Sequence, residues 1–355
     1  MAGSAVIDRW ITNRNHQISF ASFVYASKGR VSRREKFLSE MQKIVSWENL
    51  VAVVEPHCPK AERGRPPIGC LRTLRIYFLQ QWYSLAHEAI EGSLYDITSL
   101  RKFVGVDLGH EVILDATTLL KFRHLLERND LNAQMLQATN TDLEGRGLLM
   151  RVGTIVDATL IAAPSSTKNK SGKRDSEMRS TKKGNNHYFG LKAHIGVDAQ
   201  SGVVHTVRHT PANVHKHHTR GELTAWTRNG CLHRGYRGME NRKEAQNANV
   251  NVQWHIVMTP GKKKTTKAAR AQGGGTCRLA QTIDQIEKLK ASIRAKVEHP
   301  FHIVKKLFEY KKLSYKGISK NEVRHAMLFV MANQLIVKKA FSSQGYNYVQ
   351  KPVSA

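Results

Sequence analysis

An apolar stretch interrupted by one carboxylate, GTIVDATLIAAP at Gly153 to Pro164, constrains the fold more than any other part of the sequence. Its β-branched and aliphatic residues, bounded by Gly and Pro, predict a strand. Apolar residues stand at both odd and even positions, which is typical of a central strand covered on both faces. Asp157 nevertheless lies in the middle of the stretch. Because a carboxylate is rarely buried unless it is paired or binds a metal, Asp157 is a candidate functional residue.

The charge balance indicates a polyanionic partner. The 355 residues include 56 Lys and Arg against 28 Asp and Glu, which gives a formal net charge of +28. Such an excess disfavours a compact fold by self-repulsion and is typical of proteins that bind a polyanion. Nucleic acid is the first expectation and an anionic membrane surface the second. Charge alone does not separate an enzyme from a basic ribosome-associated protein.

The cysteines, the first residues and the late apolar stretch argue against zinc-ribbon, disulfide-rich, secreted and membrane-spanning proteins. Four cysteines without C-x-x-C spacing argue against a zinc ribbon and a disulfide framework, and they fit a reducing compartment. The first residues lack the apolar core of a signal peptide. The stretch 326–337 is short and contains Asn333 and Gln334, so it predicts a core helix rather than a membrane span. The sequence therefore predicts a cytoplasmic protein.

The first part of the chain is expected to be helical. Apolar residues recur at helical spacing through 36–150, most clearly from Leu71 to Leu85, and Asp115 is placed to cap a further helix. We interpret this part as a helical packing domain, with a DNA-contacting domain as the alternative. Residues 1–35 are an N-terminal extension, and 342–355 are a tail.

Residues 151–341 change character and predict an α/β domain. After the first strand, the polar and basic stretch 165–186 has no apolar period and predicts a loop or flexible arm. Residues 187–210 predict a β-hairpin, and 251–260 predict another strand. A long helix follows, and the apolar stripe on it consists of Ile283, Ile286, Leu289, Ile293 and Val297.

The late helix carries a second group of candidate residues. Arg294, Glu298 and Lys305 are four and seven residues apart, so their side chains lie within about 40° of one another on a continuous helix. Pro300 is a candidate bend. The adjacent apolar stripe, which continues to Phe301, is expected to hold this face against the sheet. The alternative is an ordinary solvated Glu–Arg pair on a helix surface.

Several stretches resemble one family, in order and over most of the chain. They are GRPPIGCLRTLRIYFLQQWYSL, LYDITSLRKFVGVDLG, TTLLKFRHLLE, GTIVDATLIAAPSSTKNKSGKRD, TKKGNNHYFGLKAHIGVDAQSG, GYRGMENR and SIRAKVEHPFHIVKK. From about Lys36 to Phe341 the chain resembles bacterial insertion-sequence transposases of the DDE type, in the group named after insertion sequence five. The resemblance implies a ribonuclease-H-like α/β catalytic domain, a mixed sheet with flanking helices, over 151–341. An all-α N-terminal domain precedes it. The implied activity is binding of element ends with metal-dependent DNA strand cleavage and transfer.

The resemblance gives the candidate residues roles. It places the first catalytic aspartate at Asp157 and the catalytic glutamate at Glu298, as ligands of Mg²⁺ or alternatively Mn²⁺. The family's helix signature of Tyr, Arg, Glu and Lys is matched by Arg294, Glu298 and Lys305, with Ala291 in place of Tyr. In two-metal sites, ions about 4 Å apart activate the nucleophile and stabilise the leaving oxygen. Mg²⁺ prefers carboxylate oxygens to His or Cys.

Basic residues are the candidate DNA contacts. Lys305 is expected to contact a phosphate near the scissile bond, and Arg294 to orient Glu298 or bind the DNA backbone. The basic loop is expected to track phosphates through Lys168, Lys170, Lys173, Lys182 and Lys183. The stretch GKKKTTK at 261–267 is expected to do the same, with a solvated charge run as the alternative for both. The resemblance implies double-stranded DNA (terminal inverted repeats and target) as partner. It also implies a homo-oligomer on DNA and a nucleoid-associated location, with no membrane involved.

The second aspartate of the family is missing. The family reads Asp-Ala-Gly-Tyr where this chain reads His-Arg-Gly-Tyr, so His233 stands at the Asp position. The resemblance is lost over 216–234 and again over 268–280, as a compensated frameshift would leave it. The altered stretch RNGCLHRGY lacks the apolar run of a central strand, so that strand is expected to be lost.

No other carboxylate is expected to replace it. Asp198 is placed in a hairpin turn, where a solvated Asp is usual, Glu222 lies in the altered stretch, and Glu240 lies beyond it. His233 is a poor ligand for Mg²⁺. Three hypotheses follow, and the first is favoured: a transposase by descent that binds DNA with impaired catalysis. The others are an active transposase with an unusual ligand set, and a non-catalytic DNA-binding regulator of related elements.

Overall fold

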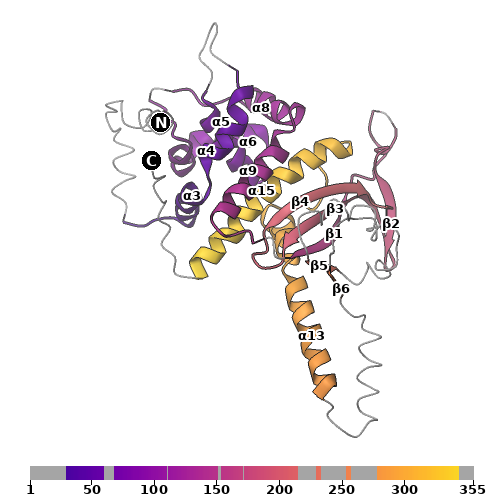
Figure 1. Ribbon diagram of the computed structural model, residues 1–355. Coiled ribbons are helices and arrows are strands. Elements are labelled where there is room, and N and C mark those ends of the chain that lie inside the picture. Colours follow the sequence, from indigo (N-terminus) through magenta and orange to yellow (C-terminus); the bar gives the residue numbers. More distant parts are fainter. Residues whose placement is uncertain are drawn as a thin grey trace.

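The computed structural model describes residues 29–59, 68–109, 111–150, 153–170, 172–214, 229–232, 253–256 and 278–343. Helices gather on one side of the molecule and strands on the other, and one long helix, α15 (Ile318–Ser343), passes between them (Figure 1). None of the helices in these ranges is both long and apolar enough to cross a membrane.

The helical side agrees with the periodicity of the sequence. Its elements are α3 (Arg33–Ile44), α4 (Trp47–Val54), the short 3₁₀-helix η1 (Glu55–His57), α5 (Cys70–Trp82), α6 (His87–Asp96), α7 (Thr98–Val104), α8 (Ala116–Arg128) and α9 (Leu131–Gly145). The spacing from Leu71 to Leu85 correctly predicts α5, whose Leu74 and Phe78 are fully buried.

Asp115 caps α8 as predicted. Its side chain accepts a hydrogen bond from the backbone N–H of Thr118 and another from the Thr117 hydroxyl. These hydrogen bonds, Thr117 first, favour the charged carboxylate and lower the pKa of Asp115 to about 2. The carboxylate satisfies a backbone donor that the helix itself leaves unpaired.

In the part of the chain that the structure describes, six strands form one mixed sheet. They are β1 (Thr154–Ala162), β2 (Arg179–Lys183), β3 (Asn186–Asp198), β4 (Val204–Pro211), β5 (Asn229–Leu232) and β6 (Gln253–Ile256). The order is β2-β3-β1-β5-β6, and β4 also pairs with β3. β3 is antiparallel to β1, β2 and β4, whereas β5 is parallel to both β1 and β6. The predicted first strand, hairpin and later strand are therefore confirmed, and β1 lies inside the sheet.

The prediction of a loop or flexible arm for residues 165–186 is wrong in part. Arg179–Lys183 form β2, which pairs with the first half of β3, and Met178 just before it is 1% exposed. β2 is an edge strand, where charged side chains stay in water and blunt the exposed edge. Its sequence therefore lacks the hydrophobic alternation from which a strand is recognised.

The expected loss of a strand within 216–234 is also wrong. Asn229–Leu232 form β5, with Ile155 paired to Cys231 in the parallel ladder to β1. Backbone hydrogen bonds to the neighbouring strands hold this segment in the sheet without an apolar run of its own. The other residues of 216–234 lie outside the described ranges. So do those of 268–280, apart from the first turn of the helix that begins at Arg278.

The long helix predicted over the Arg294–Lys305 segment is broken into three pieces. α13 (Arg278–Ala295) ends early, α14 (Glu298–His302) follows, and Ile303–Leu307 form a π-helix, η4. Proline cannot donate to the carbonyl four residues before it, and its ring clashes with that carbonyl. Pro300 therefore ends α13 near Lys296 and is tolerated in the first turn of α14.

The expected packing of the apolar stripe holds at one end. Val297 and Phe301 are buried, whereas Ile286, Leu289 and Ile293 are 45%, 63% and 37% exposed. Figure 1 shows the reason, because α13 projects away from the sheet and the other helices.

The predicted core helix at 326–337 lies within α15 and is buried along its length. α15 packs against α3 and α9 on one side and against β4 on the other. Its polar Asn333 donates to the Val204 carbonyl at 2.8 Å, accepts from the Val204 N–H at 2.8 Å, and contacts the Asn140 side chain of α9. A buried amide with such partners links the helices and the sheet.

Two of the four cysteines, Cys58 and Cys70, come together in the structure, which was not expected from the sequence. They lie side by side with their Cα atoms 6.5 Å apart, a pairing that their spacing in the sequence did not predict. One lies at the end of η1 and the other at the start of α5. Such a pairing depends on the spatial approach of two Cα atoms, which spacing along the chain does not show.

Candidate active site

Strand β1 presents Asp157 and Thr159 on the same face of the sheet. Alternate residues of a strand point to the same side, so this face also carries Ile155, which is fully buried. Asp157 is 6% exposed, and its Oδ1 accepts a hydrogen bond of 2.7 Å from the Ala158 N–H. The strand therefore holds a carboxylate at the middle of the sheet.

Arg294 joins the two predicted carboxylates. One guanidinium nitrogen lies 2.8 Å from Glu298 Oε1 and 3.4 Å from Asp157 Oδ2. Arg294 comes from the last turn of α13, and Glu298 is the first residue of α14. The Glu298 side chain is 59% exposed, whereas that of Asp157 is 8% exposed. The break in the helix does not separate Arg294 from Glu298, and the pair faces β1 as well as solvent.

Lys305 lies against β1 near the same group. Its ammonium donates to Thr159 Oγ1 at 2.6 Å and to the Leu160 carbonyl at 2.8 Å. Burial lowers the pKa of Lys305, and the nearby Lys183 lowers it further, while Glu298 opposes the change. Lys305 thus fixes the π-helix to β1, with Glu298 and Lys183 close by.

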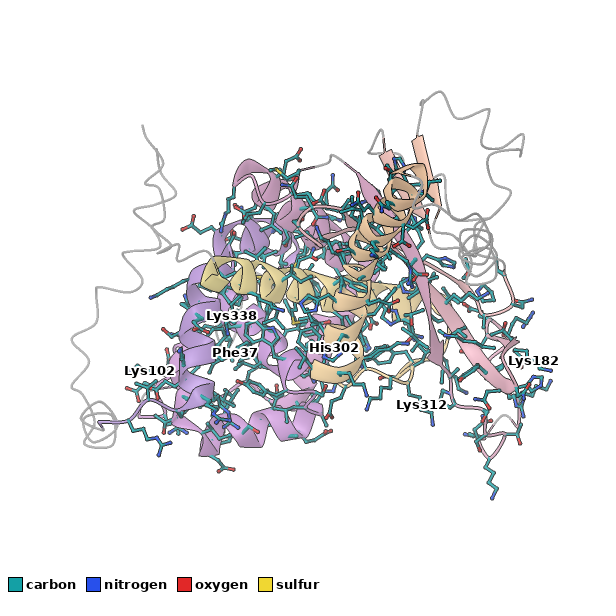
Figure 2. The ribbon with its side chains drawn as sticks, turned by 90° about the horizontal axis from the view of Figure 1, so that it is seen from below. Phe37, Lys102, Lys182, His302, Lys312 and Lys338 are labelled. Carbon is teal, nitrogen blue, oxygen red and sulfur yellow. A yellow bond between two sulfur atoms is a disulfide. The ribbon has the colours of Figure 1, made fainter. Side chains whose placement is uncertain are left out.

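The lysines predicted to contact phosphates lie in different places relative to Lys305 and the two carboxylates. All five lysines of the basic stretch are exposed, at positions Lys168, Lys170, Lys173, Lys182 and Lys183. Figure 2 shows Lys182 at the far end of the sheet from the helices. Lys183 lies within electrostatic reach of Lys305, whereas the first three lysines lie on the loop between β1 and β2. The stretch 261–267 lies outside the described ranges.

His233, the position at which we expect the missing aspartate, directly follows a described strand in the sequence. Leu232, the last residue of β5, pairs with Val156, the residue before Asp157. His233 lies outside the described residues, as do Glu222 and Glu240. The described part of β5 is thus paired with β1 up to the residue before Asp157.

Asp198 is not the solvated turn residue that was expected. It is 1% exposed, and its Oδ2 accepts hydrogen bonds from the Gln200 N–H, the Ser201 N–H and the Ser201 hydroxyl. Its register partner on β1 is Thr154, three residues before Asp157 and on the other face. Asp198 therefore holds the β3–β4 turn.

Asp157 and Glu298 offer the kind of ligand atom that a divalent metal ion such as Mg²⁺ takes. Hard oxygen ligands suit Mg²⁺, which proteins commonly bind through one or two carboxylates plus water. Arg294 already places a positive charge between Asp157 and Glu298. Within the described ranges, no three His, Cys, Asp or Glu side chains lie close enough to hold a metal ion. Two metal ions would require a further ligand.

The chain matches two family models. Residues 149–334 match the model described as Transposase DDE domain, and residues 26–125 match the one described as Transposase domain (DUF772). The chain belongs to the DDE transposase family. All four residues gathered at the carboxylate group, namely Asp157, Arg294, Glu298 and Lys305, lie inside the matched DDE segment.

Solved transposase structures share limited similarity with the chain. One is a piggyBac transposase synaptic complex with hairpin DNA, with 10% identity over 89% of this chain and 75% of that chain and a TM-score of 0.42. Another is a pre-cleavage Mos1 transpososome, with 13% identity over 97% of each chain and a TM-score of 0.20.

Positive charge is concentrated in the DDE segment of this family member. Residues 151–341 contain 36 Lys and Arg against 12 Asp and Glu, whereas residues 36–150 contain 13 against 14. The helical half is therefore almost neutral. This distribution favours the interpretation of the helical half as a packing domain over a DNA-contacting one.

Sequence reasoning missed Thr159 and the carboxylates of Asp175 and Glu177. The Thr159 hydroxyl accepts a hydrogen bond from the Lys305 ammonium, and its spacing of two residues from Asp157 on a strand indicated that both side chains lie on the same face. Asp175 and Glu177 lie in the basic stretch and accept hydrogen bonds from the backbone N–H groups of Gly317 and Ile318, at the start of α15, which no local pattern in the sequence indicates.

Proposed function

We propose that this chain is the transposase of a bacterial insertion sequence, with DNA binding retained and strand cleavage impaired. The observation that carries the proposal is the convergence of Asp157 and Glu298 on one guanidinium, that of Arg294, inside the segment matched by the DDE model. The substitution of His233 for the second family aspartate supports the impairment.

The strand order supports a ribonuclease-H-like catalytic domain over 151–341. β1 lies inside the sheet, with antiparallel β3 on one side and parallel β5 and β6 on the other. The helices from α3 to α9 support a preceding all-α domain over 36–150. In this arrangement the central strand provides one carboxylate and a helix that packs near it provides the other.

The charge distribution supports double-stranded DNA as the partner, both as terminal inverted repeats and as target. An excess of basic residues in the DDE segment provides sequence-independent attraction to phosphates. The lysines of the loop and β2, from Lys168 to Lys183, are exposed, and Lys183 lies within electrostatic reach of Lys305. A homo-oligomer on DNA and a nucleoid-associated cytoplasmic location belong to the same proposal.

Asp157 and Glu298 are the residues that would hold Mg²⁺, or Mn²⁺ in its place. A metal ion held there would supply activation of the attacking water or 3′-hydroxyl and stabilisation of the leaving oxygen. Arg294 offsets one of the two carboxylate charges and contacts both carboxylates through one nitrogen. Lys305 ties the π-helix to β1, so that Glu298 stays in place beside Asp157.

The missing carboxylate accounts for the impairment. Asp157 and Glu298 alone would hold a second metal ion weakly, and the charge that such an ion would neutralise on the leaving oxygen would then be left without a partner. Loss of one strong electrostatic group at a reacting centre costs about 3 kcal/mol, roughly a 10²-fold loss of rate. We therefore expect little or no Mg²⁺-dependent cleavage of element-end DNA by the chain as it stands.

The test is a cleavage assay with labelled duplexes that carry the ends of the element. Restoring residues 216–234 to the family pattern should produce cleavage, and adding Asp157→Ala to the restored protein should abolish it. Robust cleavage by the unmodified chain, lost on Asp157→Ala, would show that the second carboxylate lies elsewhere.

A non-catalytic DNA-binding regulator of related elements is the second candidate function. The substitution at His233 together with the strongly basic DDE segment favours it, because DNA binding does not require the carboxylates. A restored protein that binds element ends yet shows no cleavage would support this candidate over the first.

A further inference from the structure

The basic stretch is attached to the start of α15 by two carboxylates. Asp175 Oδ2 accepts the Gly317 N–H at 2.7 Å, and Glu177 Oε2 accepts the Ile318 N–H at 2.7 Å. The first N–H groups of a helix have no partner within the helix and carry partial positive charge. Asp175 and Glu177 therefore supply acceptors to α15 from a segment 142 and 141 residues earlier. We call this pair of contacts the carboxylate clasp.

The backbone at Gly317 and a contact between Asp175 and Glu177 both favour the carboxylate clasp. Gly317 has φ of +85°, a conformation that favours glycine, and a Cβ at this position would lie 3.3 Å from Glu177 Oε1. Asp175 Oδ1 also accepts the Glu177 N–H at 3.1 Å, which sets the two carboxylates relative to each other. The next residue, Met178, is buried.

The clasp lies between two groups of lysines that differ in how they are held. Lys182 and Lys183 belong to β2 and are held by the ladder to β3. Lys168, Lys170 and Lys173 lie on the loop before the clasp. Within this loop the Asn169 side-chain amide donates to the Lys173 carbonyl at 2.9 Å. The loop is thus folded on itself, and the clasp fixes its later end to the body of the protein.

We propose that Asp175 and Glu177 are positioning residues for DNA binding. They hold Lys168, Lys170 and Lys173 at a fixed place relative to the sheet and do not touch DNA themselves. This inference rests on the proposed function. It explains two acidic residues inside a basic stretch, since carboxylates near phosphates otherwise weaken DNA binding.

A matched pair of double variants separates positioning from charge. Asp175→Asn with Glu177→Gln removes both charges and keeps a carbonyl acceptor at each position. Asp175→Ala with Glu177→Ala removes the same charges and the acceptors too. The two variants have equal net charge, so any difference between them reports the clasp.

DNA affinity of the full chain should be measured against salt for the unmodified protein and both variants. Positioning predicts weaker binding and a shallower salt slope for the double Ala variant than for the Asn/Gln variant. Each lost phosphate contact lowers the slope by about 0.9, so three loosened lysines give a decrease of roughly 2 to 3. Equal slopes, with both variants binding more tightly than the unmodified protein, would mean that the carboxylates act through charge alone and would overturn the proposal.

Tryptic cleavage after Lys168, Lys170 and Lys173 tests the clasp without DNA. The double Ala variant should be cut faster there than the Asn/Gln variant at equal Tm. Equal rates in both variants would overturn the clasp whether or not the chain binds DNA. If the chain does not bind DNA but the rates differ, the proposed function fails and the clasp stands as an anchor of the loop. Glu177→Ala alone serves if the double variant does not fold.

Discussion

Leu232 of β5 lies opposite Val156 of β1 in the parallel ladder between the two strands. In the sequence, His233 follows the first of these residues and Asp157 follows the second. The strand that precedes the position at which we expect the missing aspartate is therefore present and in register with β1. A carboxylate restored at that position is expected to lie beside Asp157.

His233→Asp should by itself produce Mg²⁺-dependent cleavage of element-end DNA. The new carboxylate supplies the third oxygen ligand, so the rate should rise by about 10²-fold or more over the unmodified chain. His233→Asn is the control, because it has nearly the same size without the charge. Strand cleavage of labelled duplexes, resolved on denaturing gels, measures both. If both variants are inactive while the protein restored over 216–234 is active, the register alone does not define the site.

Arg294→Gln should make the stability of the protein depend on Mg²⁺. The guanidinium offsets one of the two negative charges of Asp157 and Glu298, and without it the two carboxylates repel each other more strongly until a cation binds between them. Mg²⁺ at about 10 times its Kd stabilises the folded state by about 1.4 kcal/mol. The Tm of Arg294→Gln should thus rise with Mg²⁺ by more than that of the unmodified chain.

The second variant for this test is Arg294→Gln combined with Glu298→Gln. It removes one of the two carboxylates, so the extra Mg²⁺ response should disappear. The same Tm rise in both variants would place the metal ion elsewhere in the protein. Differential scanning fluorimetry with Mg²⁺ from zero to millimolar concentration gives the comparison.

DNA binding should be mainly electrostatic and should depend on the basic residues of the DDE segment, residues 151–341. Affinity should fall by on the order of 10³-fold between 50 and 200 mM salt if six or more phosphates are contacted. Replacing Lys168, Lys170 and Lys173 by Ala should flatten the salt dependence by roughly 2 to 3 in logarithmic slope.

The matched control for that set lies on the nearly neutral helical half. Lys36, Lys43 and Lys102 are exposed there, and Figure 2 shows Lys102 on the opposite side of the molecule from Lys182. Replacing these three by Ala changes the net charge equally and should leave the slope close to that of the unmodified protein. Equal losses from both sets would mean that overall charge, rather than the basic loop, binds the DNA.

Acid should destabilise the protein through His325. Its ring stacks on that of His209 with centroids 4.5 Å apart, and neither of its nitrogens has a hydrogen-bond partner in the described structure. Burial lowers the pKa of His325 well below its usual value, and His209, Arg324 and Lys305 add to the effect. Because the unfolded chain then binds the proton more readily, stability is full above about pH 6.5 and falls as pH drops below it.

Each such histidine costs about 1.4 kcal/mol per pH unit below 6.5. His325→Phe keeps a ring in the stack but removes the titrating nitrogens, so the fall in Tm between pH 7 and pH 5 should be smaller in this variant. His302→Gln, at an exposed histidine, should leave that fall unchanged. A Tm profile for His325→Phe that follows the unmodified protein would assign the acid sensitivity to other groups.

Much of the fold was predictable because its elements bury regular apolar faces. The spacing around Leu74 and Phe78 predicted α5, and the apolar run around Asp157 predicted β1. β2 and β5 were not predictable in this way. Their places in the sheet come from backbone hydrogen bonds to β3 and β1, which leave no mark on side-chain pattern. The end of α13 at Ala295 was expected only as a bend at Pro300.

The residues of the candidate site could be predicted from the sequence, but the contacts between them could not. Asp157 was singled out by its apolar surroundings and Glu298 by the family's helix signature. The contact of Arg294 with Asp157 joins residues 137 positions apart, and no spacing rule reaches so far. The clasp between Asp175 and Gly317 was missed for the same reason, because both partners lie in stretches without a regular pattern of their own.

The position of α15 has a consequence for how such proteins diversify. This helix, late in the chain, fills the space between the first helices and the strands, and its buried residues belong to one continuous hydrophobic core with both. An exchange of the first half between related elements would bring α3 and α9 against an α15 that had not evolved with them. Such hybrids are expected to fold well when α15 is inherited together with the first half, so the units of exchange in this fold are discontinuous in the gene.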